Sequence, residues 1–271
     1  MQLSYIYQGK GKQVILQEIL EVDEENRKSI LIQQGIDPDG VQSRCVFNMN
    51  ETMLPLDIKE KIVRVRSHAR AVKSGSQSIG SHVTLCATVS PGPRSPPPLF
   101  IFGKLVKVPE AMSDIQNCQQ AYFDVSESGW INSDIFQRWT IQFSTWVHKQ
   151  RDLGYFTNDE AILLIQDGHS SRNNRNIHDI LQAENIRAVT LPGALTQFLQ
   201  PLDVAIFHPF RAAYGKQISG RIVDIRNSQS NNQLPKLTEE QKRRIIVESA
   251  IDALQQATTA RSRQNAFLST G

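Results

Sequence analysis

The most informative stretch of this chain is a short apolar run that ends in an acidic residue. Residues Ala161 to Ile165 read Ala-Ile-Leu-Leu-Ile, with no polar residue between the apolar ones. Such an unbroken run is typical of a strand buried on both faces of a sheet, and the Gln-Asp-Gly that follows would end it. We therefore expect Asp167 at the carboxyl end of a central strand.

The residues that follow continue the pattern of an α/β protein. Apolar residues recur at helical spacing between Ile177 and Leu181, and Ala188 to Leu191 form a second short apolar run that predicts a strand. A second aspartate, Asp203, comes after a Gln-Pro-Leu turn and opens a stretch whose apolar residues return every three or four positions. Asp203 is thus expected near the start of a helix.

Two carboxylates at neighbouring ends of secondary structure are a candidate metal site. Hard divalent cations such as Mg²⁺ prefer oxygen ligands, and paired carboxylates can hold them beside a scissile phosphate. The alternative is that Asp167 only ends a strand and Asp203 only caps a helix. The first interpretation predicts a nuclease-type site, and the second predicts no chemistry at these positions.

Several separate motifs resemble, in the same order, those of one family. The matching segments are Asn48–Thr52, His82–Ala87, Pro97–Phe102, Ser128–Ile131 with Phe136 and Trp139, Asp167–Ser171, Leu191–Pro192 with Gln200–Val204, and Ala266–Phe267 with Thr270–Gly271. Each motif alone is weak, but their common order makes the resemblance specific. The family that they resemble is the DDE superfamily endonucleases of the pogo, Tigger and jerky type, which are related to mariner transposases and to centromere protein B.

The resemblance implies an α/β fold with an RNase H-like core, in which a mixed central sheet carries helices on both faces, here with a C-terminal helical extension. It also implies three acidic residues that bind two metal ions for DNA strand cleavage and joining. The matching positions in this chain are Asn50, Asp167 and Asp203. We take these three as candidate catalytic and metal-binding residues, with Mg²⁺ or Mn²⁺ as the implied cofactor and DNA as the implied partner.

The first of the three positions lacks its acid, because Asn50 stands where the family pattern has aspartate. An amide carbonyl can coordinate a hard cation but adds no negative charge to the site. The adjacent Glu51 is expected to point away from Asp167, since successive side chains of a strand face opposite sides of the sheet. We therefore expect low metal affinity and weak or absent catalysis.

Arg172 is a second departure from the resemblance. It follows the Asp167 motif at a position where relatives commonly carry histidine. Either it removes a helper group near the second aspartate, or it is a solvated loop residue. The sequence favours neither interpretation.

The net charge of the chain is small, with 30 basic and 27 acidic residues giving +3. Bulk electrostatics therefore do not suffice for nucleic-acid binding, and any DNA surface must be local. Between Lys61 and Lys73 cations alternate with apolar or small residues, which predicts one strand face that could track phosphates. The predicted DNA-binding residues are Arg64, Arg66, His68, Arg70 and Lys73. The alternative is an edge strand guarded by charge.

Cysteine usage and hydropathy address the compartment. Cys45, Cys86 and Cys118 are widely spaced and odd in number, which favours buried reduced thiols over disulfides. No apolar run approaches the length of a membrane span, and the amino terminus carries no charged-then-apolar signal. We expect an intracellular protein without a membrane partner, placed in the nucleus by DNA chemistry. The oligomeric state stays open, with a homo-oligomer as one option.

The chain is expected to divide into four segments. Residues 1–44 are a helical or irregular lead-in, 45–222 the RNase H-like domain, 223–236 a polar linker and 237–271 a C-terminal helical segment. Asn132 is expected to cap a long helix, and Thr238 with Gln241 to form a capping box. The 49 residues before Asn50 show no basic tri-helical pattern, so we expect no sequence-specific targeting module there.

Two functions from different classes fit this sequence. The first is a transposase-derived DDE endonuclease domain whose metal-dependent phosphodiester cleavage is impaired by Asn50. The second is a non-enzymatic nuclear module, adapted from the same fold to bind DNA or a protein, in which the aspartates persist as remnants. Whether the chain is an enzyme is left undecided between them.

Overall fold

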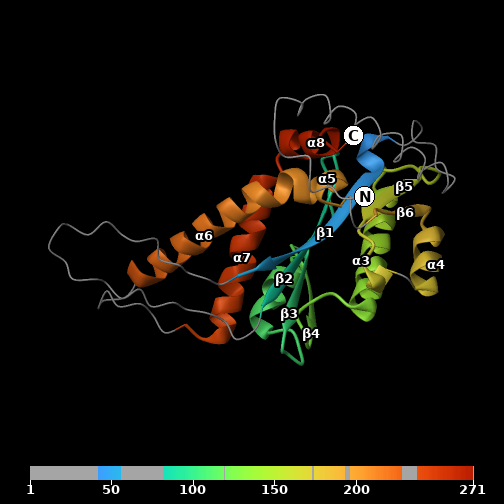
Figure 1. The fold of residues 1–271 in the computed structure, drawn as a ribbon. Helices are drawn as coiled ribbons and strands as arrows, with labels where there is room; N and C mark the ends of the chain where they lie inside the picture. The colour runs from blue at the N-terminus through green and yellow to red at the C-terminus, as the bar shows by residue number, and fades with distance from the viewer. Residues whose placement is uncertain are drawn as a thin grey trace, which may run out of the picture.

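A six-stranded mixed sheet forms the centre of the computed structural model, which describes residues 42–55, 82–118, 120–172, 174–192, 196–227 and 237–270 (Figure 1). The strands are β1 (Val46–Leu54), β2 (Val83–Val89), β3 (Leu99–Gly103), β4 (Tyr122–Ser126), β5 (Ile162–Gln166) and β6 (Ile186–Thr190). They lie in the order β4-β3-β2-β1-β5-β6. β2 runs antiparallel to both β1 and β3, whereas the β3–β4, β1–β5 and β5–β6 pairs are parallel. The two strands nearest the candidate site, β1 and β5, are therefore neighbours in the middle of the sheet.

Two helices, α3 (Ser133–Asp152) and α4 (Arg175–Ala183), cover one face of this sheet (Figure 1). α3 begins as expected at Asn132, whose side chain accepts a hydrogen bond from the Ile135 N–H. The apolar stripe of α3, which includes the stacked rings of Trp139 and Phe143, packs against Phe47 of β1. Burial of these aromatic side chains is the main force that fixes α3 on the sheet.

The other face carries α6 (Phe207–Asn227) and the C-terminal helices α7 (Glu239–Ala257) and α8 (Ala260–Leu268). α6 and α7 lie side by side in Figure 1 and share one apolar core with β2 and β3. The predicted capping box of Thr238 and Gln241 begins α7 with both hydrogen bonds formed. The mixed sheet with helices on both faces and the C-terminal helical extension are thus confirmed.

Short helical segments complete the described chain and place the site residues. They are η2 (Ser43–Cys45), η3 (Glu110–Met112), α2 (Ser113–Asn117), η4 (Ser170–Arg172), α5 (Thr196–Leu199) and the π-helical η5 (Leu202–Ile206). η4 follows β5 directly after the Asp167 turn, and η5 leads from the Gln-Pro-Leu turn into α6. The predicted positions of Asp167 after a buried strand and of Asp203 near a helix start are therefore confirmed.

Three other expectations meet the structure in different ways. Cys45 and Cys86 are buried free thiols as predicted, while Cys118 is free but exposed. α6 continues to Asn227, and the proposed division into segments stays a prediction. The predicted DNA-binding face also stays a prediction, because its residues lie outside the described part of the chain. They are Arg64, Arg66, His68, Arg70 and Lys73.

Among the helices that are described, none combines the length and apolarity that a bilayer crossing requires.

Candidate active site

Two of the three predicted site residues, Asn50 and Asp203, touch each other on the α6 face of the sheet. Asn50, in β1 and 8% exposed, donates a hydrogen bond from Nδ2 to Oδ2 of Asp203 over 2.8 Å. Its Oδ1 accepts from the backbone N–H of Glu51, also at 2.8 Å. Because a carboxylate can only accept, the nitrogen end of the amide is the end that faces Asp203. Asn50 therefore presents a donor, not a metal-ligating oxygen, to its acidic neighbour.

A buried asparagine fastens the turn before Asp203 to the sheet. Asn48 accepts a hydrogen bond from the Leu202 N–H at 3.0 Å and donates to the Ile165 carbonyl of β5 at 3.2 Å. The amide of Gln200 adds a 3.0 Å hydrogen bond to a backbone carbonyl of β1. Since these polar groups are buried, losing one partner would leave another unsatisfied, so the turn is held firmly. The position of Asp203 beside β1 is built by this network.

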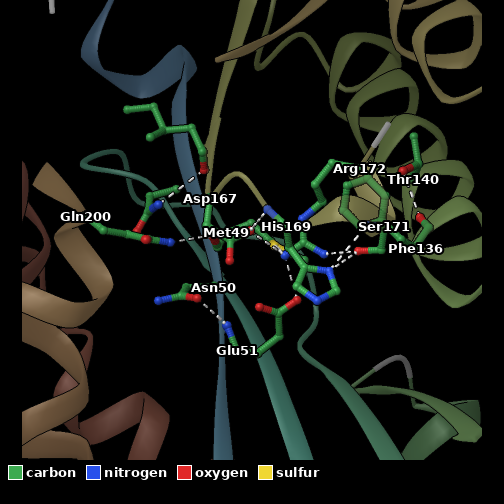
Figure 2. A network of polar contacts seen from close by, with 12 residues as sticks. Met49, Asn50, Glu51, Phe136, Thr140, Asp167, His169, Ser171, Arg172 and Gln200 are labelled. Atoms are coloured by element: carbon green, nitrogen blue, oxygen red, sulfur yellow. Dashed lines mark hydrogen bonds and ion pairs between the residues drawn. The ribbon is translucent and has the colours of Figure 1, made fainter. Parts of the chain in front are cut away.

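The third predicted residue, Asp167, is bound by a cation on the α3 face of the sheet. Nη2 of Arg172 lies 2.9 Å from Oδ1 of Asp167 and 2.8 Å from Oε1 of Glu51 (Figure 2). Arg172 is only 3% exposed, and its guanidinium carbon lies 4.5 Å from the centre of the Phe136 ring. Its Nη1 donates to the Ser171 hydroxyl at 2.8 Å. One buried guanidinium therefore joins a carboxylate of β1 to a carboxylate of the turn that follows β5.

Two sequence expectations are corrected by this arrangement. Glu51 was expected to aim away from Asp167, yet both carboxylates bind the same nitrogen of Arg172. Alternation does place Glu51 and Asn50 on opposite faces, but Asp167 lies beyond the last residue of β5 and is not held to that alternation. The interpretation of Arg172 as a solvated loop residue is also wrong, because its side chain is buried.

His169 extends the Arg172 network toward the loop. Its Nδ1 lies 2.8 Å from the Ser171 hydroxyl and accepts a 3.3 Å hydrogen bond from the Ser171 N–H. The His169 N–H in turn points to Oδ1 of Asp167 at 3.4 Å. Sequence reasoning missed the roles of Glu51, Ser171 and His169. The signal that could have found them is the run of hydrogen-bonding residues directly after Asp167, which can fold back on that carboxylate.

The pKa shifts show how these groups act on one another. Partial burial raises the pKa of Asp203, while the hydrogen bond from Asn50 and the charge of Arg211 lower it and the charge of Asp167 raises it. Burial also raises the pKa of Glu51, against the lowering effect of Arg172. Asp167 is therefore near enough to influence both other carboxyls. Asn50 and Asp203 are in contact, and Asp167 lies close to them with its carboxylate turned to Arg172.

The donors do not fit the pair of divalent ions that the resemblance implies. The Asn50 amide turns its nitrogen to Asp203, and Asp167 with Glu51 is occupied by Arg172. Within the part of the chain that the structure describes, no three His, Cys, Asp or Glu side chains gather in a way that could hold a metal ion. Two Mg²⁺ or Mn²⁺ ions need several negatively charged oxygens directed at them. The carboxylate oxygens of this arrangement are too few to hold two such ions, because one oxygen of each carboxylate already contacts Asn50 or Arg172.

Comparisons with solved structures place the fold. The chain is similar to the transposase in the "Mos1 Strand Transfer Complex", with 12% identity, a TM-score of 0.50, and coverage of 92% of this chain and 58% of that one. It is also similar to the "Mos1 transposase catalytic domain and Raltegravir with Mn", with 12% identity, a TM-score of 0.42, and coverage of 89% and 94%. The likeness to the strand transfer complex is to the fold, and the RNase H-like core expected from the sequence is confirmed.

Sequence comparisons place the family. A protein of Cochliobolus lunatus named "MFS-type transporter clz9" is 29% identical over 102 residues, which are 36% of this chain and 10% of that protein. The chain thus spans about a tenth of this relative and little more than half of the transposase in the strand transfer complex. The sequence pattern of the DDE superfamily endonuclease matches residues 81–265, more than half of the chain. The chain belongs to the DDE superfamily endonuclease family.

Proposed function

We propose that this chain is a transposase-derived DDE domain that binds DNA and in which metal-dependent phosphodiester cleavage is strongly reduced. The family and the fold support an origin in DNA strand cleavage. The observation that carries the reduced activity is the contact between Asn50 and Asp203, in which an amide nitrogen stands where a metal-binding carboxylate is expected. The chain keeps the scaffold of the reaction without its full set of ligands.

The loss of one carboxylate has a large expected effect on rate. A metal ion at such a site stabilises charge that develops on the scissile phosphate, and the ligands must first hold the ion in place. Each 1.4 kcal/mol of lost transition-state stabilisation reduces the rate about tenfold. A site that loses a charged ligand and gains an amide N–H therefore has an activation free energy higher by on the order of a few kcal/mol. The cleavage rate falls correspondingly, by about a hundredfold or more.

Divalent metal binding in this chain is proposed to be weak. One of the similar Mos1 structures contains Mn and another contains Mg. In this chain Asp203 is the site carboxylate that no described Arg or Lys pairs with, and its Oδ2 already accepts from Asn50. Mg²⁺ or Mn²⁺ would bind there with low affinity, because a single carboxylate that is hydrogen-bonded to a neutral amide provides little charge compensation.

Binding to DNA, residence in the nucleus and self-association are parts of the proposal that rest on the family. Structures similar to this chain include a pre-cleavage Mos1 transpososome and a Mos1 transposase paired-end complex. The basic face predicted between Arg64 and Lys73 would supply phosphate contacts, each of them sensitive to salt. A DNA-binding domain of this kind acts where chromatin is, which is the reason for placing it in the nucleus.

A second candidate function is favoured by one observation. The ion pair between Arg172 and Asp167 leaves the latter carboxylate neutralised inside the protein. A chain that only binds DNA or a protein partner needs no free carboxylates, and such an ion pair would then serve the fold. On this alternative the chain is a binding module without any cleavage activity.

A plasmid-nicking experiment with Mg²⁺ or Mn²⁺ tests the proposal. The native chain should nick at background level, Asn50→Asp should nick faster, and Asn50→Asp with Arg172→Gln should gain about tenfold or more over background. Adding Asp203→Ala to the double variant should abolish the gain. If neither variant nicks, the binding-module alternative is favoured, and if the native chain nicks at the rate of the variants, the proposed impairment is wrong.

Duplex binding is measured separately by fluorescence anisotropy at increasing salt. We expect affinity that falls steeply between about 50 and 200 mM salt, because phosphate contacts release counterions. Asp203→Ala should leave this affinity unchanged or raise it slightly. Absence of binding at low salt would contradict DNA as the partner of this chain.

A further inference from the structure

We propose that Arg172 is a built-in cation that holds Glu51 and Asp167 together in place of a divalent metal ion, so that Asp167 does not serve as a metal ligand in the native chain. The inference rests on the proposed function only in treating Asp167 as a position of the same site. It adds Glu51 to that site and places a cation-binding site on the α3 face, which is occupied by the Arg172 side chain.

The geometry requires a cation between these two carboxylates. Oε1 of Glu51 and Oδ1 of Asp167 both lie within 2.9 Å of one nitrogen, Nη2 of Arg172. Their side chains are 11% and 28% exposed, so water screens their mutual repulsion only in part. Two like charges that share a site strongly disfavour each other's ionised form unless a positive charge lies between them. Arg172 supplies that charge.

The guanidinium is fixed in this place by its other contacts. It lies against the Phe136 ring, and its Nη1 donates to Ser171, which also contacts His169. Only Nε of Arg172 is left without a hydrogen-bond partner within the described residues. If this buried arginine moved to solvent, both carboxylates and the Ser171 hydroxyl would lose their hydrogen-bond partner, so the side chain is held in one position.

A divalent ion would compete for the same oxygens. Carboxylate oxygens bind Mg²⁺ or Ca²⁺ at roughly 2.0 to 2.6 Å, and those of Glu51 and Asp167 already contact the guanidinium. Metal binding would have to displace a buried, bonded cation, and the displaced guanidinium would lose both of its ion pairs. Removal of the positive charge should therefore convert the pair into a site that needs a cation and can take one from solution.

The test compares thermal unfolding of the native chain and Arg172→Gln with no divalent ion, with Mg²⁺ and with Mn²⁺, without DNA. The melting temperature of the native chain should move by less than about 1 °C, while that of Arg172→Gln should rise saturably by about 3–5 °C on adding metal. Direct Mn²⁺ binding, followed by electron paramagnetic resonance, should increase at least about tenfold in the variant. An unchanged metal response in Arg172→Gln would overturn the proposal.

Three further variants separate this site from general effects. Arg172→Lys keeps a positive charge and should remain insensitive to metal, and Glu51→Gln with Arg172→Gln should lose the metal response. Arg151→Gln is the matched control, because the Arg151 side chain is 6% exposed and bonds mainly to backbone carbonyls. It should destabilise the chain without creating a response to Mg²⁺ or Mn²⁺. A metal response of Arg151→Gln equal to that of Arg172→Gln would overturn the assignment.

A measurement on the native fold covers the case in which Arg172→Gln does not fold. Asp167→Asn keeps an oxygen that can accept from Arg172, so it should leave the Mn²⁺ affinity of the chain as it is in the native protein. A loss of Mn²⁺ binding on this substitution would show that Asp167 is a metal ligand and would overturn the proposal. Because no readout involves DNA or cleavage, this result is independent of whether the proposed function holds.

Discussion

The acidic side chains on the two faces of β1 have different partners, a neutral amide on one face and a buried guanidinium on the other. On the α6 face Asp203 is partly exposed, and its side chain accepts a hydrogen bond from the amide of Asn50. On the α3 face Glu51 and Asp167 enclose a buried guanidinium. Adjacent residues of one strand, Asn50 and Glu51, thus belong to two different electrostatic environments separated only by the thickness of the sheet.

The acids of the two faces therefore differ in role, because those of the α3 face are paired with an internal cation and Asp203 is not. Glu51 and Asp167 share one cation inside the fold, because both carboxylates contact Nη2 of Arg172. Asp203 has no Lys or Arg within ion-pair distance in the described ranges, and partial burial keeps its pKa raised. Carboxylates that a fold leaves imperfectly compensated are found mainly at functional positions. On this argument Asp203 is the remnant of the ancestral site, and Asp167 has become one half of an ion pair with the buried Arg172.

The largest predicted effect is the loss of stability when the buried cation of the α3 face is removed. Arg172→Met should reduce the free energy of unfolding by about 3–5 kcal/mol, because it leaves two carboxylates without their cation. The loss should be greater at pH 8 than at pH 5. Burial already raises the pKa of Glu51, and without Arg172 this pKa rises further. The folded form of Arg172→Met therefore takes up a proton at acid pH and recovers part of its stability there. Urea unfolding at both pH values measures this.

The control for Arg172→Met is an ion pair at the surface. Arg138 binds Asp124 at 2.7 Å, but its side chain is 52% exposed. Arg138→Met should therefore cost only about 0–1 kcal/mol. Equal losses for the two variants would mean that burial of the guanidinium contributes nothing special on the α3 face.

The next largest effect concerns the α6 face. Asn50→Asp, measured without divalent metal, should reduce the free energy of unfolding by about 1 kcal/mol, because it replaces a hydrogen bond to Asp203 by a contact between like charges. Asn50→Asp with Asp203→Asn exchanges donor and acceptor and should recover most of the loss. A double-mutant cycle in urea gives the coupling between the two positions. A coupling near zero would contradict the contact as a stabilising one.

Much of this architecture could be predicted from the sequence, and for identifiable reasons. The run from Ala161 to Ile165 has no polar alternation, so a strand buried on both faces was its simplest outcome, and Asp167 had to follow it. Asn132 and Thr238 precede helices that need caps, and both cap them. These features depend on local chemistry, which the sequence states directly.

What could not be predicted depends on contacts between distant segments. An arginine in a polar loop is usually solvated, and nothing near Arg172 indicates that its loop folds over Phe136. The bond between Glu51 and Arg172 joins positions 121 residues apart. Strand alternation correctly separated Asn50 from Glu51 but could not place Asp167, because the rule ends where β5 ends.

The smallest predicted effect sharpens the comparison through the pH dependence of Asp203→Asn. In the native chain the pKa of Asp203 is raised above its ordinary value of 3.8, so the folded state holds the proton more tightly than the unfolded state. The stability that this group contributes is therefore complete below pH 3.8 and is lost as pH rises through the raised pKa. Asparagine has no such loss, so Asp203→Asn should raise the free energy of unfolding by a few tenths of a kcal/mol relative to the native chain at pH 7 and lose that advantage near pH 3. The gain is small because water screens a partly exposed carboxyl.

Asp179→Asn, which removes an exposed aspartate from α4, controls for the loss of one surface charge. If Asp203→Asn were instead less stable at pH 7 than at pH 3 relative to the native chain, Asp203 would be a compensated structural acid like Asp167, and the two faces of β1 would not differ in the way described.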